Sequence, residues 1–234
     1  NPYKFGLIGS SDIHTSLSTT AEDNFFGKFP ESAPNEKRSS NHLAGSAWAN
    51  WRLSSSGLTA IWAHENTREA LFDAMMRKEV YATTGSRIKV RFFGGWDFNA
   101  KDVSRSNYAD IGYKKGVPMG GDLSNGPKDR APSFLIIAAK DPDGANLDRI
   151  QIIKGWIDAN GQNKEKIYNV SLSDGREVDL NTGEVPSVGS TVNIDDATYS
   201  NTIGSAYLPG FWTDPHFDSS QHAFYYARGL EIPV

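Results

Sequence analysis

Two short apolar runs stand out in the first third of the chain, and glycine lies at or beside the end of each. They cover residues 3–9 and residues 57–63. A short apolar run bounded by turn residues is typical of a buried strand. We therefore predict a buried strand at each run. Polar and ionisable side chains follow both strands directly, at Asp12-Ile13-His14 and at His64-Glu65-Asn66.

Residues 67–78 have the periodicity of an amphipathic helix. Four apolar side chains recur on one face, at Leu71, Phe72, Met75 and Met76. Arg77 and Lys78 follow at the C-terminal end, where the helix dipole favours cations. Asn66 followed by Glu69 matches a capping box, with Asn in place of Ser or Thr. We predict a helix whose N-cap is Asn66.

The segment between the two predicted strands, residues 16–56, is long, polar and poor in periodicity. Trp48 and Trp51 stand at helical spacing among alanines, so we predict a short helix within residues 41–53. Long segments of this kind inside compact domains are usually functional lids or are disordered. Because aromatic residues are frequent in it, we predict an ordered insertion.

After the predicted helix the pattern changes to short β-branched and aromatic runs. The predicted strands cover residues 80–84, 88–93, 134–139, 147–155, 166–172, 191–194 and 223–227. Asp-Gly and Asn-Gly turns separate several of them, and no helical period returns after Gly95. This pattern is typical of an antiparallel β-sandwich. We place a domain boundary near residue 87, which gives domains at residues 1–87 and 88–234.

The composition narrows the class of protein. The chain has 234 residues and is 38% hydrophobic, enough for a packed core in one or two domains. Its net charge of −4 argues against a nucleic-acid partner. No apolar run approaches the roughly 20 residues of a membrane-spanning helix, so no membrane partner is expected. The chain enters the first strand at once, without an initiator Met or a signal peptide, and we expect a piece that begins in mid-domain.

The absence of cysteine restricts the chemistry. Without Cys there is no disulfide, no thiolate zinc cluster and no cysteine nucleophile, so a metal site must use His, Asp, Glu and water. The chain also lacks the G-x-S-x-G, Walker and G-x-G-x-x-G motifs, which leaves serine-hydrolase, P-loop and dinucleotide interpretations unsupported. A chain without Cys suits the periplasm and the cytosol alike. We favour a periplasmic or secreted location over a cytoplasmic one.

Asp12 and His14 are the sharpest local signal of chemistry in the sequence. On an extended chain, residues i and i+2 project to the same side, so both side chains can face one ion. One oxygen and one nitrogen ligand suit zinc, manganese or iron better than calcium. Bound molecules of α/β proteins gather at the carboxyl ends of strands, and this pair comes just after the carboxyl end of a predicted strand. The plain alternative is a surface turn in which Asp12 caps a neighbouring group.

Three residues near the predicted helix are further candidates. His64 or Glu65 could orient a metal ligand or act as a general base. Alternatively, they form only the polar approach to a helix N-terminus, where the dipole favours Glu65. Arg68 lies in the first helical turn, where the helix dipole disfavours a cation. A bound anion such as phosphate, between Arg68 and the helix N-terminus, would offset this unfavourable interaction. The alternative is a solvated Arg68 paired with Glu65 or Glu69.

The remaining candidates have simpler explanations. His42, His216 and His222 have no partner at ligand spacing, and we interpret them as surface or packed histidines. Residues 141–144 resemble the start of a calcium loop, but Pro142 and the missing acidic residue at the twelfth position favour a hairpin turn. The six Trp and nine Tyr could build a sugar-stacking platform, although in a β-rich domain they more often fill the core.

Six longer runs of the sequence carry a resemblance to a known family. They are GSSDIHT at residues 9–15, AEDNFFGK at 21–28, ENTREALFDA at 65–74, VYATTGSR at 80–87, RFFGGW at 91–96 and DPDGANLD at 141–148. These runs resemble the C-terminal part of the DUF3604 family, large bacterial proteins of uncharacterised function that are related to the PHP (polymerase and histidinol phosphatase) metallohydrolases. Together the similar runs are spread over almost the whole chain.

The resemblance implies a fold. PHP domains are distorted (β/α) barrels whose metal cluster is built from histidines and acidic residues. The last of these metal ligands along the chain come from a D-x-H motif. Asp12 and His14 match that motif, while the family's opening H-x-H and its middle ligands would lie upstream of Asn1. The chain would then be of the α+β class. Residues 1–87 would be the C-terminal remnant of a PHP-type barrel, with the insertion at 16–56, and residues 88–234 a mainly antiparallel β-sandwich.

The resemblance also implies an activity. An intact relative would use divalent zinc, manganese or iron ions to activate water against a phosphoryl or similar ester. We therefore expect part of a metal-dependent hydrolase, a phosphoesterase for a small anionic ester, whose metal site is incomplete in this chain alone. His64 and Glu65 are then candidate catalytic residues. From chemistry alone, Arg68 and Arg87 are candidate contacts of the anionic substrate.

Two expectations about partners follow. The upstream part of the same protein would complete the metal site, and the chain by itself would be inactive. An open barrel fragment exposes strand edges and apolar faces, which predicts self-association or covering by the insertion. The alternative function is a non-catalytic β-sandwich module that binds carbohydrate or docks the barrel.

Overall fold

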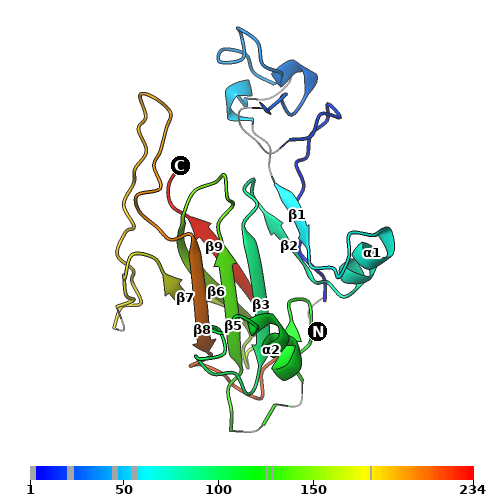
Figure 1. Cartoon of the computed structure of the whole chain (residues 1–234), viewed down its shortest axis with the longest axis vertical. Coiled ribbons are helices and arrows are strands. Elements are labelled where there is room, and N and C mark those ends of the chain that lie inside the picture. The colour runs from blue at the N-terminus through cyan, green and yellow to red at the C-terminus, as the bar shows by residue number, and fades with distance from the viewer. Residues whose placement is uncertain are drawn as a thin grey trace. The chain divides into compact units, whose positions relative to one another are not determined.

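The computed structural model describes residues 4–19, 24–43, 47–53, 57–124, 126–127, 129–179 and 181–234. The chain divides into two compact units, Asn1–Arg87 and Ile88–Val234, and each is described by itself. The described residues form mainly antiparallel sheets with two short helices, α1 (Arg68–Met76) and α2 (Tyr108–Lys115) (Figure 1). Within this part of the chain, no helix has both the length and the apolar character that crossing a membrane requires.

The described residues of the first unit form one pair of antiparallel strands, one α-helix and two short 3₁₀ turns. β1 (Leu58–Ile61) pairs with β2 (Val80–Thr83) along their whole length, and α1 connects them. Both strands and the helix were predicted and are confirmed, but the prediction that the strand at residues 57–63 is buried is wrong. β1 is only half-buried, because β2 alone pairs with it among the described residues. No barrel is found in these residues, since this sheet has two strands and they are antiparallel.

The prediction of a buried strand at residues 3–9 is wrong over the described residues 4–9. These residues form no strand, and Phe5, Leu7 and Ile8 are 52–70% exposed. The segment still lies against the β1–β2 pair, because the Thr59 hydroxyl donates to the Gly9 carbonyl. An apolar run becomes a buried strand only where packed elements cover it on both sides. Tyr3 lies outside the described residues.

The helix α1 begins one residue later than predicted. The side chain of Thr67, not Asn66, accepts the hydrogen bond from the Ala70 amide, at 3.3 Å. Thr67 has the extended backbone of an N-cap, so its side chain satisfies an amide that the first helical turn leaves unpaired. The apolar face of the helix is largely exposed, at Phe72, Met75 and Met76.

The insertion at residues 16–56 has a small core of its own in its described parts. Ser32 and Asn50 are almost fully buried there, and the Asn50 amide donates to the Glu31 carbonyl at 3.0 Å. The helix predicted around the two tryptophans is reduced to the 3₁₀ turn η3 (Asn50–Arg52), after a similar turn η2 (Pro30–Ser32). Trp48 and Trp51 are more than half exposed, so they do not form this core.

The described residues of the second unit form two antiparallel sheets in layers, together with the helix α2 (Figure 1). One sheet has the order β4 (Gly116–Pro118), β3 (Lys89–Gly95), β5 (Ser133–Ala139), β8 (Tyr207–Thr213). The other has the order β7 (Asn163–Leu172), β6 (Leu147–Ile157), β9 (Ala223–Glu231). Their inner faces share one core, in which Phe134 and Ile136 of the first sheet meet Ile150 and Ile152 of the second. The predicted antiparallel pairing is confirmed.

Three elements of this unit were not predicted, and one prediction is wrong. Residues 191–194 form no strand and contribute only an isolated bridge between Asn193 and Thr198. β4 and β8 were missed, and β8 contains Pro209 and Gly210, which weaken any strand pattern. The helix α2 was missed as well. It contains Gly112, a poor helix former by propensity.

Candidate functional site

Asp12 and His14 lie on an exposed turn beyond Gly9, and their side chains meet there. The Nε2 atom of His14 is 3.3 Å from Oδ1 of Asp12. Asp12 has φ of 52°, in the left-handed region that Asp enters more readily than most residues. Its amide donates to the Ser10 hydroxyl at 3.2 Å. The pair therefore meets through a turn and not, as the sequence suggested, through an extended chain.

Two residues of the insertion hold this pair in place. The His14 amide donates to the Lys28 carbonyl at 2.8 Å, and the His14 ring stacks on Phe29 with 4.5 Å between centroids. The Lys28 ammonium forms an ion pair with Oδ2 of Asp12. The hydrogen bond from Lys28, together with its charge, lowers the pKa of Asp12 below its usual value. Asp12 is thus a carboxylate that already contacts one cation.

Sequence reasoning assigned no role to Lys28 or Phe29. The available signal was weak, because these residues lie 16 and 17 positions after Asp12. Lys28 does end one of the runs that resemble the family, at residues 21–28. Only the path of the insertion brings both side chains to the turn of Asp12 and His14.

The candidates near α1 leave the strand pair at its other end. Gly9 lies close against the Leu58 end of β1, since a Cβ atom added to it would be 2.5 Å from the Leu58 carbonyl oxygen. The turn of Asp12 therefore starts at that end of the strand. His64 and Glu65 follow the Ile61 end. A strand of four residues is about 10 Å long. The two groups of candidates therefore leave opposite ends of β1, and His64 and Glu65 are exposed.

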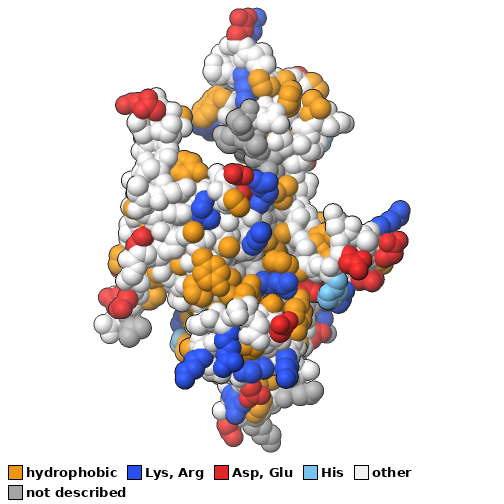
Figure 2. Space-filling model, in the orientation of Figure 1, with side chains coloured by type: hydrophobic (Ala, Val, Ile, Leu, Met, Phe, Trp, Pro, Cys, Tyr) orange, Lys and Arg blue, Asp and Glu red, His pale blue; other side chains and the backbone are white. Residues whose placement is uncertain are grey.

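The two arginine candidates divide in the same way. Arg68 is the first residue of α1 and follows the Ile61 end of the pair. Arg87 follows Thr83, the partner of Leu58, and so leaves the sheet at the same end as the Asp12 turn. Acidic and basic side chains lie together over α1 (Figure 2). The plain alternative for Arg68, a solvated cation among carboxylates, is consistent with this surface.

The donors at the turn form only part of a metal site. Catalytic zinc sites use three protein ligands and structural sites use four. Asp12 and His14 supply one carboxylate and one imidazole, and no group of three His, Cys, Asp or Glu side chains suited to a metal occurs in the part of the chain that the structure describes. The ammonium of Lys28 beside Asp12 also opposes a second cation. These residues do not fit a complete centre.

A second polar cluster, which the sequence did not predict, lies between the two sheets of the second unit. Lys154 on β6 and Asp214 after β8 are buried, with 2.6 Å between Nζ and Oδ2. The Tyr225 hydroxyl donates to the same oxygen at 2.6 Å, and the His216 amide donates to Oδ1 at 2.9 Å. Lys154 also donates to the His216 carbonyl at 2.7 Å. The cluster ties the turn after β8 to β6.

The phenols of this cluster stay protonated well above neutral pH. Burial, with the charge of Asp214, raises the pKa of Tyr168 to about 12. Burial and the hydrogen bond to Asp214 raise the pKa of Tyr225 as well. The Tyr168 hydroxyl lies 3.0 Å from Nδ1 of His216, a histidine that the sequence analysis interpreted as surface or packed. Because the charges of Lys154 and Asp214 neutralise each other, we interpret the cluster as a structural cross-link between β6, β9 and the turn after β8.

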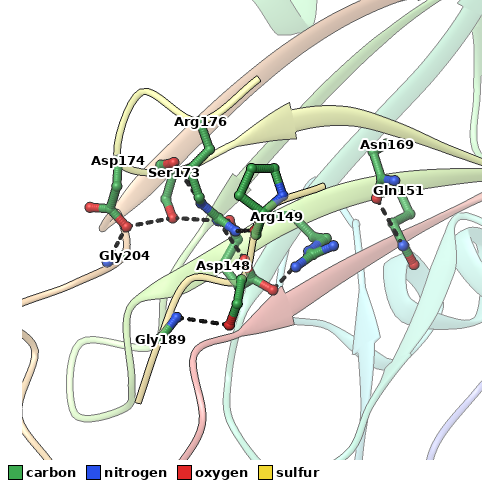
Figure 3. A network of polar contacts seen from close by, with 11 residues as sticks. Asp148, Arg149, Gln151, Asn169, Ser173, Asp174, Arg176, Gly189 and Gly204 are labelled. Atoms are coloured by element: carbon green, nitrogen blue, oxygen red, sulfur yellow. Dashed lines mark hydrogen bonds and ion pairs between the residues drawn. The ribbon is translucent and has the colours of Figure 1, made fainter. Parts of the chain in front are cut away.

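A third network fixes the long loop between β7 and β8 (Figure 3). Arg176 forms an ion pair with Asp148 on β6 and donates to the Asp148 carbonyl at 2.7 Å. It also donates to the Pro186 carbonyl at 2.9 Å, farther along the loop. Asp174 accepts from the Gly204 amide at 2.8 Å, where the loop returns. These contacts are structural, since every one joins the loop to itself or to the sheet.

Among known proteins, the chain matches a family model but no curated protein and no solved structure. Searches of curated proteins and of solved structures gave no significant match. No finding links the chain to the PHP metallohydrolases. One family model, described as "Protein of unknown function (DUF3604)", matches residues 1–234. Because this match extends over the whole sequence, both units included, the chain belongs to the DUF3604 family.

Proposed function

We propose that this chain is part of a PHP-like metal-dependent hydrolase, to which it supplies Asp12 and His14 as metal ligands. The supporting observation is the 3.3 Å contact between the two side chains on an exposed turn. Imidazole and carboxylate together suit zinc, manganese or iron. The remaining ligands would come from an upstream part of the same protein. The chain alone is then inactive.

The surroundings of the pair suit a shared site. The side chains of His14 and Asp12 are 53% and 58% exposed, so donors from elsewhere can reach them. The stack on Phe29 fixes the imidazole plane, as neighbouring groups commonly do for metal-bound histidines. Lys28 would exchange its contact with Asp12 for a contact with a solvent or substrate oxygen.

The proposal gives each unit a role. Residues 1–87 would end a PHP-type distorted barrel, and residues 88–234 would form an accessory β-sandwich domain. The substrate would be a small anionic ester, and a divalent ion would supply the activation of water. Of the two arginines, Arg87 would be the anion contact, a role supported by its position after β2 at the end of the sheet from which the Asp12 turn also leaves. Catalysis by His64 and Glu65, anion binding by Arg68 and a periplasmic or secreted location remain predictions.

Calorimetric titration of the purified chain with zinc and with manganese tests the ligand assignment. We expect weak binding that Asp12→Ala and His14→Ala each abolish, because neither donor suffices alone. Lys28→Met should strengthen binding, since it removes the competing ammonium. His42→Ala is the matched histidine control and should leave binding unchanged. Binding that persists in the double variant Asp12→Ala, His14→Ala contradicts the assignment.

Assays of the full-length parent test the activity. Its metal content is measured first, followed by hydrolysis of phosphomonoesters, phosphodiesters and carboxyl esters. We expect bound metal and phosphoester hydrolysis, both lost in Asp12→Ala. A metal-free parent, or one whose hydrolysis does not depend on Asp12, rules the hydrolase proposal out.

A non-catalytic β-sandwich module, for carbohydrate binding or domain docking, is the second candidate function. It is favoured by the core of the second unit, where side chains of both sheets, such as Phe134 and Ile152, pack together. All members of that core lie within residues 88–234, so it closes without the Asp12 turn.

A further inference from the structure

The outer face of the sheet β7–β6–β9 carries an ordered grid of side chains. Successive residues of a strand point to opposite faces, and Ile152 of β6 points into the shared core. Its odd-numbered neighbours therefore lie on the outer face. With their cross-strand partners they form three rows: Asn169–Gln151–Arg228, Ile167–Ile153–Tyr226 and Glu165–Gly155–Phe224.

The middle of this grid is apolar and partly open to solvent. Ile153 is fully buried although it lies on the outer face, in the row between Ile167 and Tyr226. Ile167 and Phe224 are 45% and 49% exposed, and Ile157 beside them is 49% exposed. Ile153 is thus the floor of an exposed apolar patch, which is a common mark of a binding surface.

Two aromatic rings dominate the patch. Phe224 and Tyr226 are nearly parallel, with 14° between their planes and 6.4 Å between their centroids. Gly155 provides the space for this arrangement, because a Cβ atom there would lie 2.2 Å from Cζ of Phe224. The Phe224 ring therefore leans across β6 and covers the glycine instead of standing clear of the sheet.

A polar row borders the rings on one side. Nε2 of Gln151 donates to Oδ1 of Asn169 at 3.0 Å, and Figure 3 shows the two amides side by side. This bond leaves Oε1 of Gln151 and the NH₂ group of Asn169 to bond a ligand. Arg228 completes the row, and Glu165 lies on the other side of the apolar row. The three rows hold one basic and one acidic residue, so their formal charges cancel.

We propose that this outer face binds neutral carbohydrate. Sugar rings combine apolar C–H faces with a rim of hydroxyl groups. Aromatic rings pack against such C–H faces, while amide and guanidinium groups pair with hydroxyls. The cancelling charges of Arg228 and Glu165 favour a neutral polymer over an anionic one. The inference deepens the second candidate function and is independent of Asp12 and His14.

The test is retention of the purified 234-residue chain on insoluble cellulose, chitin, starch and xylan, and its retardation in gels that contain soluble neutral polysaccharides. We expect retention on at least one neutral polymer. Phe224→Ala and Tyr226→Ala should each weaken it by about tenfold, since each ring supplies part of the stacking surface. Tyr207→Ala, which removes an exposed aromatic ring from β8, is the matched control. Circular dichroism confirms that each variant is folded.

These experiments distinguish neutral carbohydrate from a second copy of the chain as the group that covers the outer face. Failure to bind any neutral polymer, or binding that Phe224→Ala and Tyr226→Ala leave unchanged, overturns the proposal. If the chain instead forms a dimer that these variants dissociate, a second copy occupies the face and the proposal is also overturned. The variant Asp12→Ala should bind carbohydrate normally. A failure here is therefore distinct from a failure of the metal assignment.

Discussion

The ammonium of Lys154 lies 2.6 Å from the carboxylate of Asp214, a residue 60 positions later in the chain. Neither side chain is more than 3% exposed. Burying two charges is costly, and their attraction offsets that cost only when the remaining donors and acceptors are also satisfied. Tyr225 and the His216 backbone supply those bonds. The second unit is therefore sensitive to the loss of either charge.

Replacing Asp214 should destabilise the second unit strongly. Asp214→Ala leaves the Lys154 ammonium buried without its partner, and we expect the free energy of unfolding to fall by about 3–5 kcal/mol. Urea unfolding followed by tryptophan fluorescence measures the change. Asp195→Ala, exposed in the long loop between β7 and β8, is the control and should change stability by no more than about 0.5 kcal/mol. A loss below about 1 kcal/mol in Asp214→Ala would show that water reaches Lys154.

Alkaline pH should weaken the same unit through Tyr168. Its pKa is raised from 10.0 to about 12, so above pH 10 the unfolded chain loses the phenolic proton before the folded chain does. The stability that this group contributes is complete below pH 10 and is lost as the pH rises towards 12. Urea unfolding between these pH values should show a shallower decline in Tyr168→Phe than in the wild type. Equal slopes would refute the shift.

Gly112→Ala should destabilise the protein although helix propensity predicts the opposite. In an exposed helix this change stabilises by about 1 kcal/mol. Here the new Cβ atom would lie 2.6 Å from ring carbons of Phe93, which is only 1% exposed. We expect a loss of about 1–3 kcal/mol by urea unfolding. Lys114→Ala, exposed on the same helix, is the control, and a stabilising Gly112→Ala would contradict the packing.

Thr67→Ala should weaken the start of α1, whereas Asn66→Ala should not. The Thr67 side chain accepts the Ala70 amide, and losing such a cap costs about 1 kcal/mol. Hydrogen exchange of the Ala70 amide measures the effect locally, and we expect it to accelerate only in Thr67→Ala. Equal acceleration in both variants would mean that the two side chains share the cap.

Features that depend on one continuous segment of the chain could be predicted from the sequence, whereas features that depend on distant segments could not. The helix at Arg68–Met76 was predicted because its periodicity lies within one segment. β3, β5, β6, β7 and β9 of the second unit were predicted because β-branched and aromatic runs alternate with turn residues. β8 was missed because Pro209 and Gly210 obscure its pattern, and its pairing with β5 fixes it as a strand. α2 was missed because Gly112 is a poor helix former, and its close approach to Phe93 cannot be read from the sequence.

The candidate site was predicted in part for the same reason. Asp12 and His14 are two residues apart, so the sequence alone indicated that their side chains could meet. Lys28 and Phe29 reach them only through the path of the insertion. The sequence could not tell that His64 and Glu65 leave the other end of β1, because chain direction at a strand end is set by strand pairing.

The sequence by itself determined the antiparallel β-rich character of the chain, its helix at residues 68–76, its family resemblance and the proximity of Asp12 to His14. These features depend on neighbours within a few positions. Only the tertiary structure decided which apolar runs are buried and which distant residues meet. Phe5, Leu7 and Ile8 stay exposed because no strand of the described residues pairs with their segment. Lys154 meets Asp214, and Phe224 packs across Gly155, because strand pairing and sheet packing bring together side chains that are far apart in the sequence.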